Sequence, residues 1–123
     1  PMPTGRTEVR MAVLDGQLYA AGGTEAGNGA SSTTVERYDL ATKSWEAVAP
    51  MAWDRENLDV AVLDSKLYAA GGISDGDGFL SSVERYDPAL DAWEEVAPMA
   101  EARSLNAVAA LDGKLYAVGG TNA

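Results

Sequence analysis

Three arginines recur at one place in a repeated pattern, and they are the side chains of this chain best suited to binding. Arg6, Arg55 and Arg103 each lie sixteen positions before the first glycine of a Gly-Gly pair. A guanidinium presents a planar fork of donors that suits bidentate contact with carboxylates or phosphates. If the three side chains face one rim, they form a cationic cluster. Alternatively, each pairs with an internal carboxylate and anchors its own connection.

The residue types that most enzymes need are missing from this sequence. It holds no histidine and no cysteine, so the commonest general base, the commonest metal ligand and thiolate sites are absent. Asp75-Gly76-Asp77-Gly78 is similar to the start of a calcium loop, but the later ligands of such a loop do not follow. We therefore expect no catalytic residues, no metal site and no cofactor.

The net charge of −10, from 19 acidic and 9 basic residues, disfavours binding to nucleic acid or to an anionic membrane. The acids recur in each copy of the pattern, Glu36 and Glu84 among them, and we expect them on the solvated surface. No apolar run is long enough to span a bilayer. The N-terminal residues lack the apolar core of a secretory signal, which favours a cytoplasmic location and leaves a secreted mature form open.

A sequence repeat positions these arginines. Tyr38 to Tyr86 and Trp45 to Trp93 are both 48 residues apart, and glycine pairs mark three copies: Gly22 and Gly23, Gly71 and Gly72, Gly119 and Gly120. A fixed period of this size indicates stacked units that cannot bury their apolar faces alone.

Each copy is expected to form four short strands. In the first copy these are residues 8–14, 18–22, 35–39 and 45–48. Asp15-Gly16 between apolar runs predicts a tight hairpin, and Pro50 suits the end of an outer strand, because proline cannot donate to a β-ladder. The polar loops at 24–32 and 73–82 differ between copies, as loops that carry binding residues do.

The double glycine, the VERYD segment, the tryptophan and the VAPM segment together resemble kelch repeats, most closely those of substrate adaptors for cullin-type ubiquitin ligases. The resemblance covers the whole chain. It implies an all-β fold, a segment of a kelch-type β-propeller with four-stranded antiparallel blades. The domain 1–123 then holds a first blade at 2–50, a second at 51–98 and a half blade at 99–123.

The resemblance also implies roles for individual residues. The glycine pairs allow tight packing, and the repeated aromatic residues Tyr38, Tyr86, Trp45 and Trp93 pack between blades. The candidate partner-binding residues are the three arginines at the channel entrance, Asn57 and Ser104 near the same rim, and Phe79 in the second loop. For Phe79 the alternative is packing against its own blade.

These observations predict a non-catalytic protein-interaction module that binds a protein, or an acidic or polar peptide, through the arginine rim and the loops. A second interpretation is a structural fragment that self-associates or is completed by a partner or by the rest of a longer propeller. Two blades and a hairpin cannot close, and their end faces would expose apolar surface. A small-molecule enzyme on a complete propeller is a third interpretation.

Overall fold

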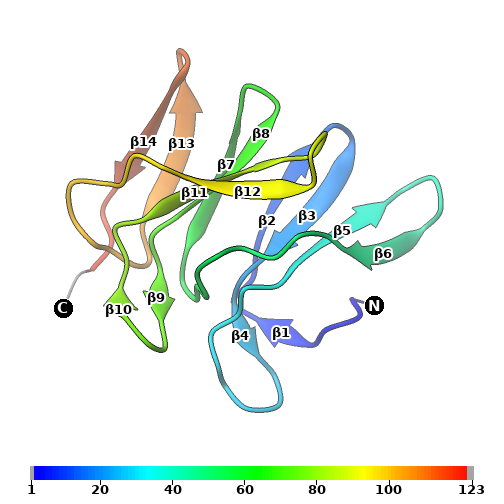
Figure 1. The fold of residues 1–123 in the computed structure, drawn as a ribbon, viewed down its shortest axis with the longest axis horizontal. Helices are drawn as coiled ribbons and strands as arrows, with labels where there is room; N and C mark the ends of the chain where they lie inside the picture. Colours follow the sequence, from blue (N-terminus) through cyan, green and yellow to red (C-terminus); the bar gives the residue numbers. More distant parts are fainter. Residues whose placement is uncertain (1, 122–123) are drawn as a thin grey trace.

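The computed structural model describes residues 2–121, and every regular element in this range is a β-strand (Figure 1). The first blade has the strand order β2-β3-β5-β6 and the second β7-β8-β11-β12, with β13 and β14 forming a third, two-stranded sheet. All pairings are antiparallel, which confirms the expected all-β blades. The strands span β2 Arg10–Leu14, β3 Gln17–Ala21, β5 Val35–Asp39, β6 Ser44–Ala47, β7 Asp59–Leu63, β8 Lys66–Ala70, β11 Val83–Asp87, β12 Ala92–Val96, β13 Ala107–Leu111 and β14 Lys114–Val118.

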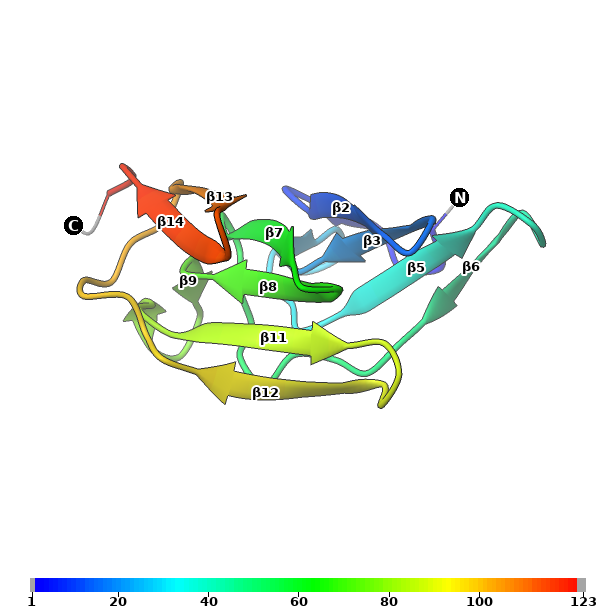
Figure 2. The ribbon, with the colours of Figure 1, turned by 90° about the horizontal axis from the view of Figure 1, so that it is seen from above.

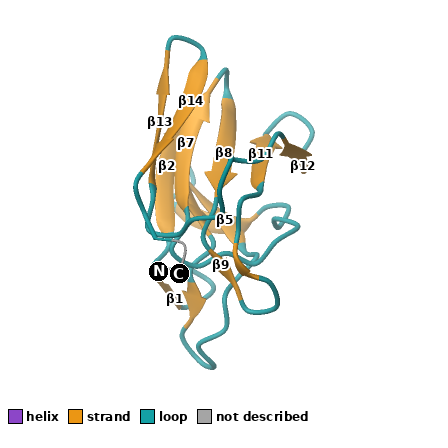
Figure 3. Cartoon of the chain, turned by 90° about the vertical axis from the view of Figure 1, so that its left-hand side faces the viewer, coloured by secondary structure: helices purple, strands orange, loops and turns teal. Residues whose placement is uncertain are grey.

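The sheets are arranged one after another, with their first strands together. β2 contacts β7, and β7 contacts β13, and Figure 3 shows these strands side by side. The last strands, β6 and β12, form the opposite edges of their sheets (Figure 2). The second sheet therefore lies between the other two, and the first and third sheets each face it with one side.

The predicted hairpin turn is present, and it recurs in the second copy. Asp15 and Gly16 have φ values of 51° and 73°, as a two-residue turn of this type requires. Asp64 and Ser65 form the same turn with φ values of 51° and 59°, so a serine adopts the left-handed conformation where the other copies have glycine.

Two small sheets were not predicted from the sequence. β1 (Arg6–Thr7) pairs with β4 (Thr24–Glu25), and β9 (Ile73–Ser74) pairs with β10 (Gly78–Phe79). A two-residue strand carries no periodic pattern of apolar residues, so periodicity does not detect it.

The main core lies between the first and second blades. Its buried residues come from both sheets and from the connection between them, and they include Leu14, Tyr19, Met51, Leu58, Val60, Leu67 and Tyr86. Burying an aliphatic side chain of this size stabilises a fold by about 1.5–3 kcal/mol. A smaller cluster of Tyr68, Ala70 and Val83 lies at the boundary of the second and third blades. The blades thus stabilise one another through shared cores.

Two of the glycine pairs lie where the backbone is closely approached, the first glycine by the next blade and the second by its own blade. A Cβ added to Gly22 would lie 2.5 Å from the carbonyl oxygen of Arg55 in the next connection, and one added to Gly23 would lie 2.4 Å from that of Thr7. The amide of Gly23 donates to the Arg55 carbonyl at 2.8 Å. At Gly119 an added Cβ would have no described atom within 4 Å.

Candidate functional site

The structure places Arg6 and Arg55 inside the protein, where they are 8% and 0% exposed. Arg55 Nη2 donates to Glu84 Oε2 at 2.9 Å, and Nη1 donates to the carbonyl oxygens of Gly71 and Ser82, each at 2.9 Å. Arg6 contacts Glu36 at 2.8 Å in the same way. Burial lowers the pKa of Arg55, and the charge of Glu84 opposes that effect. The guanidinium groups of Arg6 and Arg55 are thus paired with internal carboxylates, which was the alternative to a cationic cluster.

The location expected for the two carboxylate partners is wrong. Glu36 and Glu84 were expected on the solvated surface, but each is 1% exposed. Glu84 also accepts hydrogen bonds from the amides of Ala52 at 2.7 Å and Trp53 at 3.2 Å. The arginine–glutamate pair therefore fixes the connection that leads into the second blade. The signal that could have revealed this role is a glutamate inside a strand with sheet neighbours on both sides.

Arg103 occupies the equivalent place in the third blade but has different surroundings. Its Nη1 donates to the Gly119 carbonyl at 3.0 Å, as Arg55 does to Gly71. Its side chain is partly exposed, and it forms no ion pair with any residue in 2–121. Arg103 is the only one of the three arginines whose guanidinium is not already matched with a carboxylate in the described part of the chain.

The two polar residues expected near the rim do not join the arginines in one open site. Asn57 is partly exposed with φ of 53°, and its carbonyl accepts a hydrogen bond from the amide of Leu105 at 2.9 Å. Ser104 is fully buried. The arginine rim expected from the sequence is therefore divided between two buried side chains and one partly exposed one.

Acidic and hydroxyl side chains join the loops of the first two blades. Asp54 accepts hydrogen bonds from Ser31 Oγ, from Ser74 Oγ at 2.9 Å and from the amide of Asp75 at 2.8 Å. Asp75 Oδ2 in turn accepts from the amide of Ser31 at 3.0 Å. Burial alone would raise the pKa of Asp54, but these hydrogen bonds outweigh it and lower the pKa. The Asp-Gly-Asp-Gly loop thus begins with a residue that ties two blades together.

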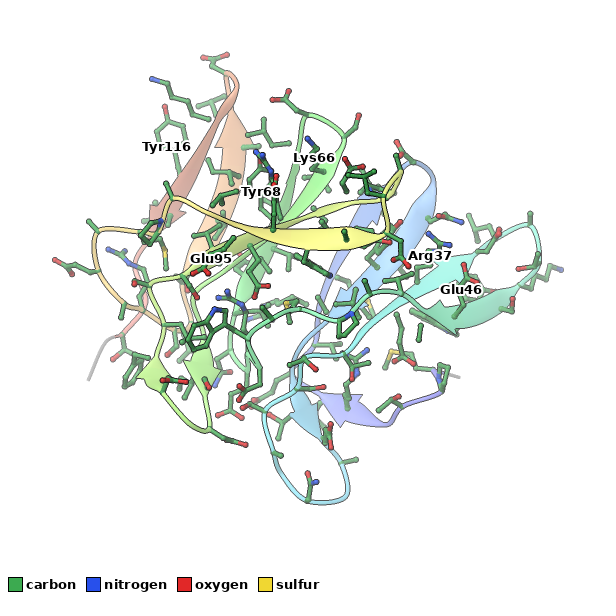
Figure 4. The ribbon with its side chains drawn as sticks, viewed as in Figure 1. Arg37, Glu46, Lys66, Tyr68, Glu95 and Tyr116 are labelled. Carbon is green, nitrogen blue, oxygen red and sulfur yellow. The ribbon has the colours of Figure 1, made fainter. Side chains whose placement is uncertain are left out.

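A groove of about 320 Å³ opens beside Phe79. The partly exposed rings of Trp53 and Phe79 both line it, and the exposed carboxylates Asp77 and Glu95 lie on its walls; Figure 4 labels Glu95 on β12. The sequence singled out Phe79 but missed Trp53, because this tryptophan lies outside the repeated position. The groove combines aromatic surface with negative charge, so it can receive an apolar group or a cation.

Other kinds of site are not evident in the described residues. Within 2–121, no group of three or more histidine, cysteine, aspartate or glutamate side chains could hold a metal ion. The same range contains no helix long and apolar enough to cross a bilayer.

The kelch motif matches this sequence twice, over residues 5–52 and 55–100. Each match contains the strands of one four-stranded sheet, β2 to β6 in the first and β7 to β12 in the second. Kelch repeats form propeller blades that generally mediate protein–protein interaction. The two matches cover most of the chain, and the sheets have the antiparallel order of propeller blades. This chain belongs to the kelch-repeat family.

Proposed function

We propose that this chain is a non-catalytic protein-binding module of the kelch type, and that its binding site is the groove between Trp53 and Phe79. The observation that carries the proposal is the meeting, in one groove, of two aromatic side chains that the repeat does not require. The amides of Ser32 and Leu80 donate to the carbonyl oxygens of Gly23 and Gly72, both at 2.9 Å, so Ser32 and Leu80 are equivalent residues of the two blades. Phe79, which precedes Leu80, therefore takes the place that Ser31 has in the first blade.

Trp53 is also particular to the second blade. It lies two residues before Arg55, where the first and third copies have Thr4 and Glu101. Large aromatic side chains are the residues that most often dominate the free energy of a protein interface. A partly exposed pair of them at loop positions, where repeats vary, supports a role in binding rather than in holding the blades together.

The charges around the groove favour a ligand that carries a cation beside an apolar anchor. Asp77 and Glu95 supply negative charge, and the chain as a whole has a net charge of −10. The guanidinium groups of Arg6 and Arg55, which an acidic peptide would need, are buried against their own carboxylates. We therefore propose a basic partner segment rather than the acidic one expected from the arginine rim.

Two peptides of equal length test this function, one of alternating lysine and leucine and one with glutamate in place of every lysine. The lysine peptide is expected to bind the chain and quench tryptophan fluorescence, and Trp53→Ala and Phe79→Ala should each weaken its binding about tenfold or more. Tyr116→Ala is the matched control, because Tyr116 is an exposed ring on β14 outside the groove. Preference for the glutamate peptide, or equal binding by all variants, would contradict the proposal.

A second candidate function is assembly of blades from separate copies of the chain. It is favoured by exposed apolar side chains on the two end sheets, Met11 and Val13 on β2 and Leu111 and Val118 on β13 and β14. These residues take the positions that pack at the internal boundaries between blades. Sedimentation of the chain over a range of concentrations separates this function from peptide binding.

A further inference from the structure

The two aromatic residues of the Trp53–Phe79 groove stand on backbone that the protein holds in place. The amide of Trp53 donates to the buried carboxylate of Glu84 at 3.2 Å. The next residue, Asp54, accepts a hydrogen bond from Ser74 Oγ at 2.9 Å. Ser74 lies on β9, which pairs with β10, the strand that carries Phe79 (Figure 1). The backbone that carries both rings is therefore fixed by one connected set of hydrogen bonds before any ligand arrives.

Two carboxylates give this groove a negative charge that the protein does not neutralise. Asp77 and Glu95 line the groove and are both exposed, and neither forms an ion pair within residues 2–121. The charge of Glu95 acts on Arg55, but Arg55 is already paired with Glu84. A cation is thus the ligand whose charge complements the groove, and the faces of the two aromatic rings attract the same kind of charge.

The backbone that lines the groove has little hydrogen-bonding capacity left for a ligand. Three consecutive lining carbonyls already accept hydrogen bonds from the protein: those of Leu80, Ser81 and Ser82 accept from the amides of Arg103 and Met99 and from Arg55 Nη1, at 3.0, 2.9 and 2.9 Å. The Ser82 hydroxyl oxygen accepts from Arg55 Nη2 at 2.9 Å. A lysine ammonium brings three donors and an arginine guanidinium five. On entering the groove, either group would lose hydrogen bonds to water that the lining backbone does not replace.

A trimethylated lysine keeps its positive charge but has no N–H group, so it enters such a groove without leaving a donor unpaired. We infer that the groove selects a trimethylated lysine of the partner segment, with the quaternary ammonium group against the rings of Trp53 and Phe79. The exposed carboxylates of Asp77 and Glu95 attract the same charge. This inference rests on the proposed function, because it names the cation that the same groove takes.

Peptides that differ at one residue test the choice of cation. The lysine–leucine peptide with its central lysine trimethylated should bind the 123-residue chain about tenfold more tightly than the unmethylated peptide in calorimetry. The neutral analogue, in which carbon replaces the quaternary nitrogen, has the same shape without the charge and should lose this gain. A peptide with arginine at the same position should bind more weakly than the trimethylated one. Equal or weaker binding of the trimethylated peptide, or full affinity of the neutral analogue or of the arginine peptide, overturns the inference.

Substitutions in the groove test whether the aromatic faces make this choice. Trp53→Leu and Phe79→Leu keep an apolar side chain but remove the ring, so each should reduce the ratio of the two affinities, trimethylated over unmethylated, to about two or less. Tyr116→Leu is the matched control, because it removes an exposed ring outside the groove and should leave the ratio unchanged. Circular dichroism checks that each variant remains folded. A ratio that survives in both groove variants refutes the site.

The same measurements separate this inference from the proposed function. If the unmethylated peptide binds, and Trp53→Ala and Phe79→Ala weaken its binding, while trimethylation adds nothing, the groove is the binding site and the selection of methylated lysine is wrong. If neither the methylated nor the unmethylated peptide binds the chain, both are wrong. Binding of the trimethylated peptide alone supports the inference, with a stricter preference than tenfold.

Discussion

Arg55 and Arg103 are the same residue of the repeat in two different environments. Both guanidinium groups donate to the first glycine of their pair, but only Arg55 has a glutamate within hydrogen-bonding distance in the described chain. The buried pair of Arg55 and Glu84 fixes the connection before β7, because Glu84 also accepts hydrogen bonds from the amides of Ala52 and Trp53. The contribution of this arginine to stability therefore depends on its neighbours rather than on its position in the repeat.

Replacement of Arg55 by glutamine should lower the free energy of unfolding by about 3–5 kcal/mol, because it leaves Glu84 buried without a counter-charge. The same replacement at Arg103 removes a single hydrogen bond from a partly exposed side chain and should cost about 0.5–1.5 kcal/mol. Urea unfolding followed by circular dichroism measures both. Equal losses in the two variants would show that the buried ion pair does not stabilise the fold.

At the scale of elements, polar side chains join the loops and aromatic side chains join the sheets. Asp54 holds the loops of two blades through Ser31, Ser74 and the amide of Asp75. Trp93 joins the outer strand β12 to the end of the first blade through the carbonyl of Ala49. These contacts lead to two predictions, one for pH and one for packing.

Acid should destabilise the chain partly through Asp54. Its pKa lies below the ordinary value of 3.8 in the folded state, so the unfolded state binds the proton more tightly. The stabilisation from the Asp54 carboxylate is complete above pH 3.8 and is lost as the pH falls through the lower pKa of the folded state. In Asp54→Asn, melting temperatures measured across this range should vary less with pH than in the wild-type chain. An unchanged dependence on pH would contradict this role.

Trp93→Ala should lower the free energy of unfolding by about 3–5 kcal/mol, because it removes a large side chain packed against the shared core. Trp45→Ala is the matched control. Trp45 lies 5.3 Å from Tyr38 between ring centroids, on the face of the first sheet that has no described blade against it. Trp45→Ala should therefore lower the free energy of unfolding by less than Trp93→Ala does. Thermal unfolding of both variants provides the comparison, and a greater loss for Trp45 would be inconsistent with packing between blades.

At the scale of the whole molecule, the two end sheets resemble the two sides of an internal blade boundary. Val13 takes the position of Val62, which packs against the shared core, but Val13 is 65% exposed. On the other end sheet, Val118 takes the position of the buried Ala70 and is 66% exposed. In the proposed assembly from separate copies, one copy covers the end sheet of another in a head-to-tail arrangement.

We expect the mass of the 123-residue chain in analytical ultracentrifugation to rise with concentration. Val13→Lys and Val118→Glu should each reduce this association, because each places a charge in an apolar interface. Leu90→Lys, at the exposed turn between β11 and β12, is the control and should leave association unchanged. A monomer at every concentration would exclude the head-to-tail arrangement.

The repeated pattern predicted the four strands of each blade and the turn at Asp15-Gly16, and the resemblance to kelch repeats implied the all-β class. These features depend on local periodicity and on backbone preferences, which a single stretch of sequence contains. The short strands β1, β4, β9 and β10 were missed because two residues have no period. Phe79 was found as an isolated aromatic residue in a loop, whereas Trp53 gave no signal until the fold placed it in the same groove.

The sequence placed Arg6, Arg55 and Arg103 at equivalent positions, but only the tertiary structure distinguished them. Arg55 meets Glu84 across 29 residues of chain, and this contact decides whether the guanidinium is buried or available. Identical residues at identical repeat positions have the same local conformation, as their shared bonds to the glycine pairs demonstrate. Their exposure and charge pairing depend on the strand that lies beside them, which brings Glu36 to Arg6 and Glu84 to Arg55.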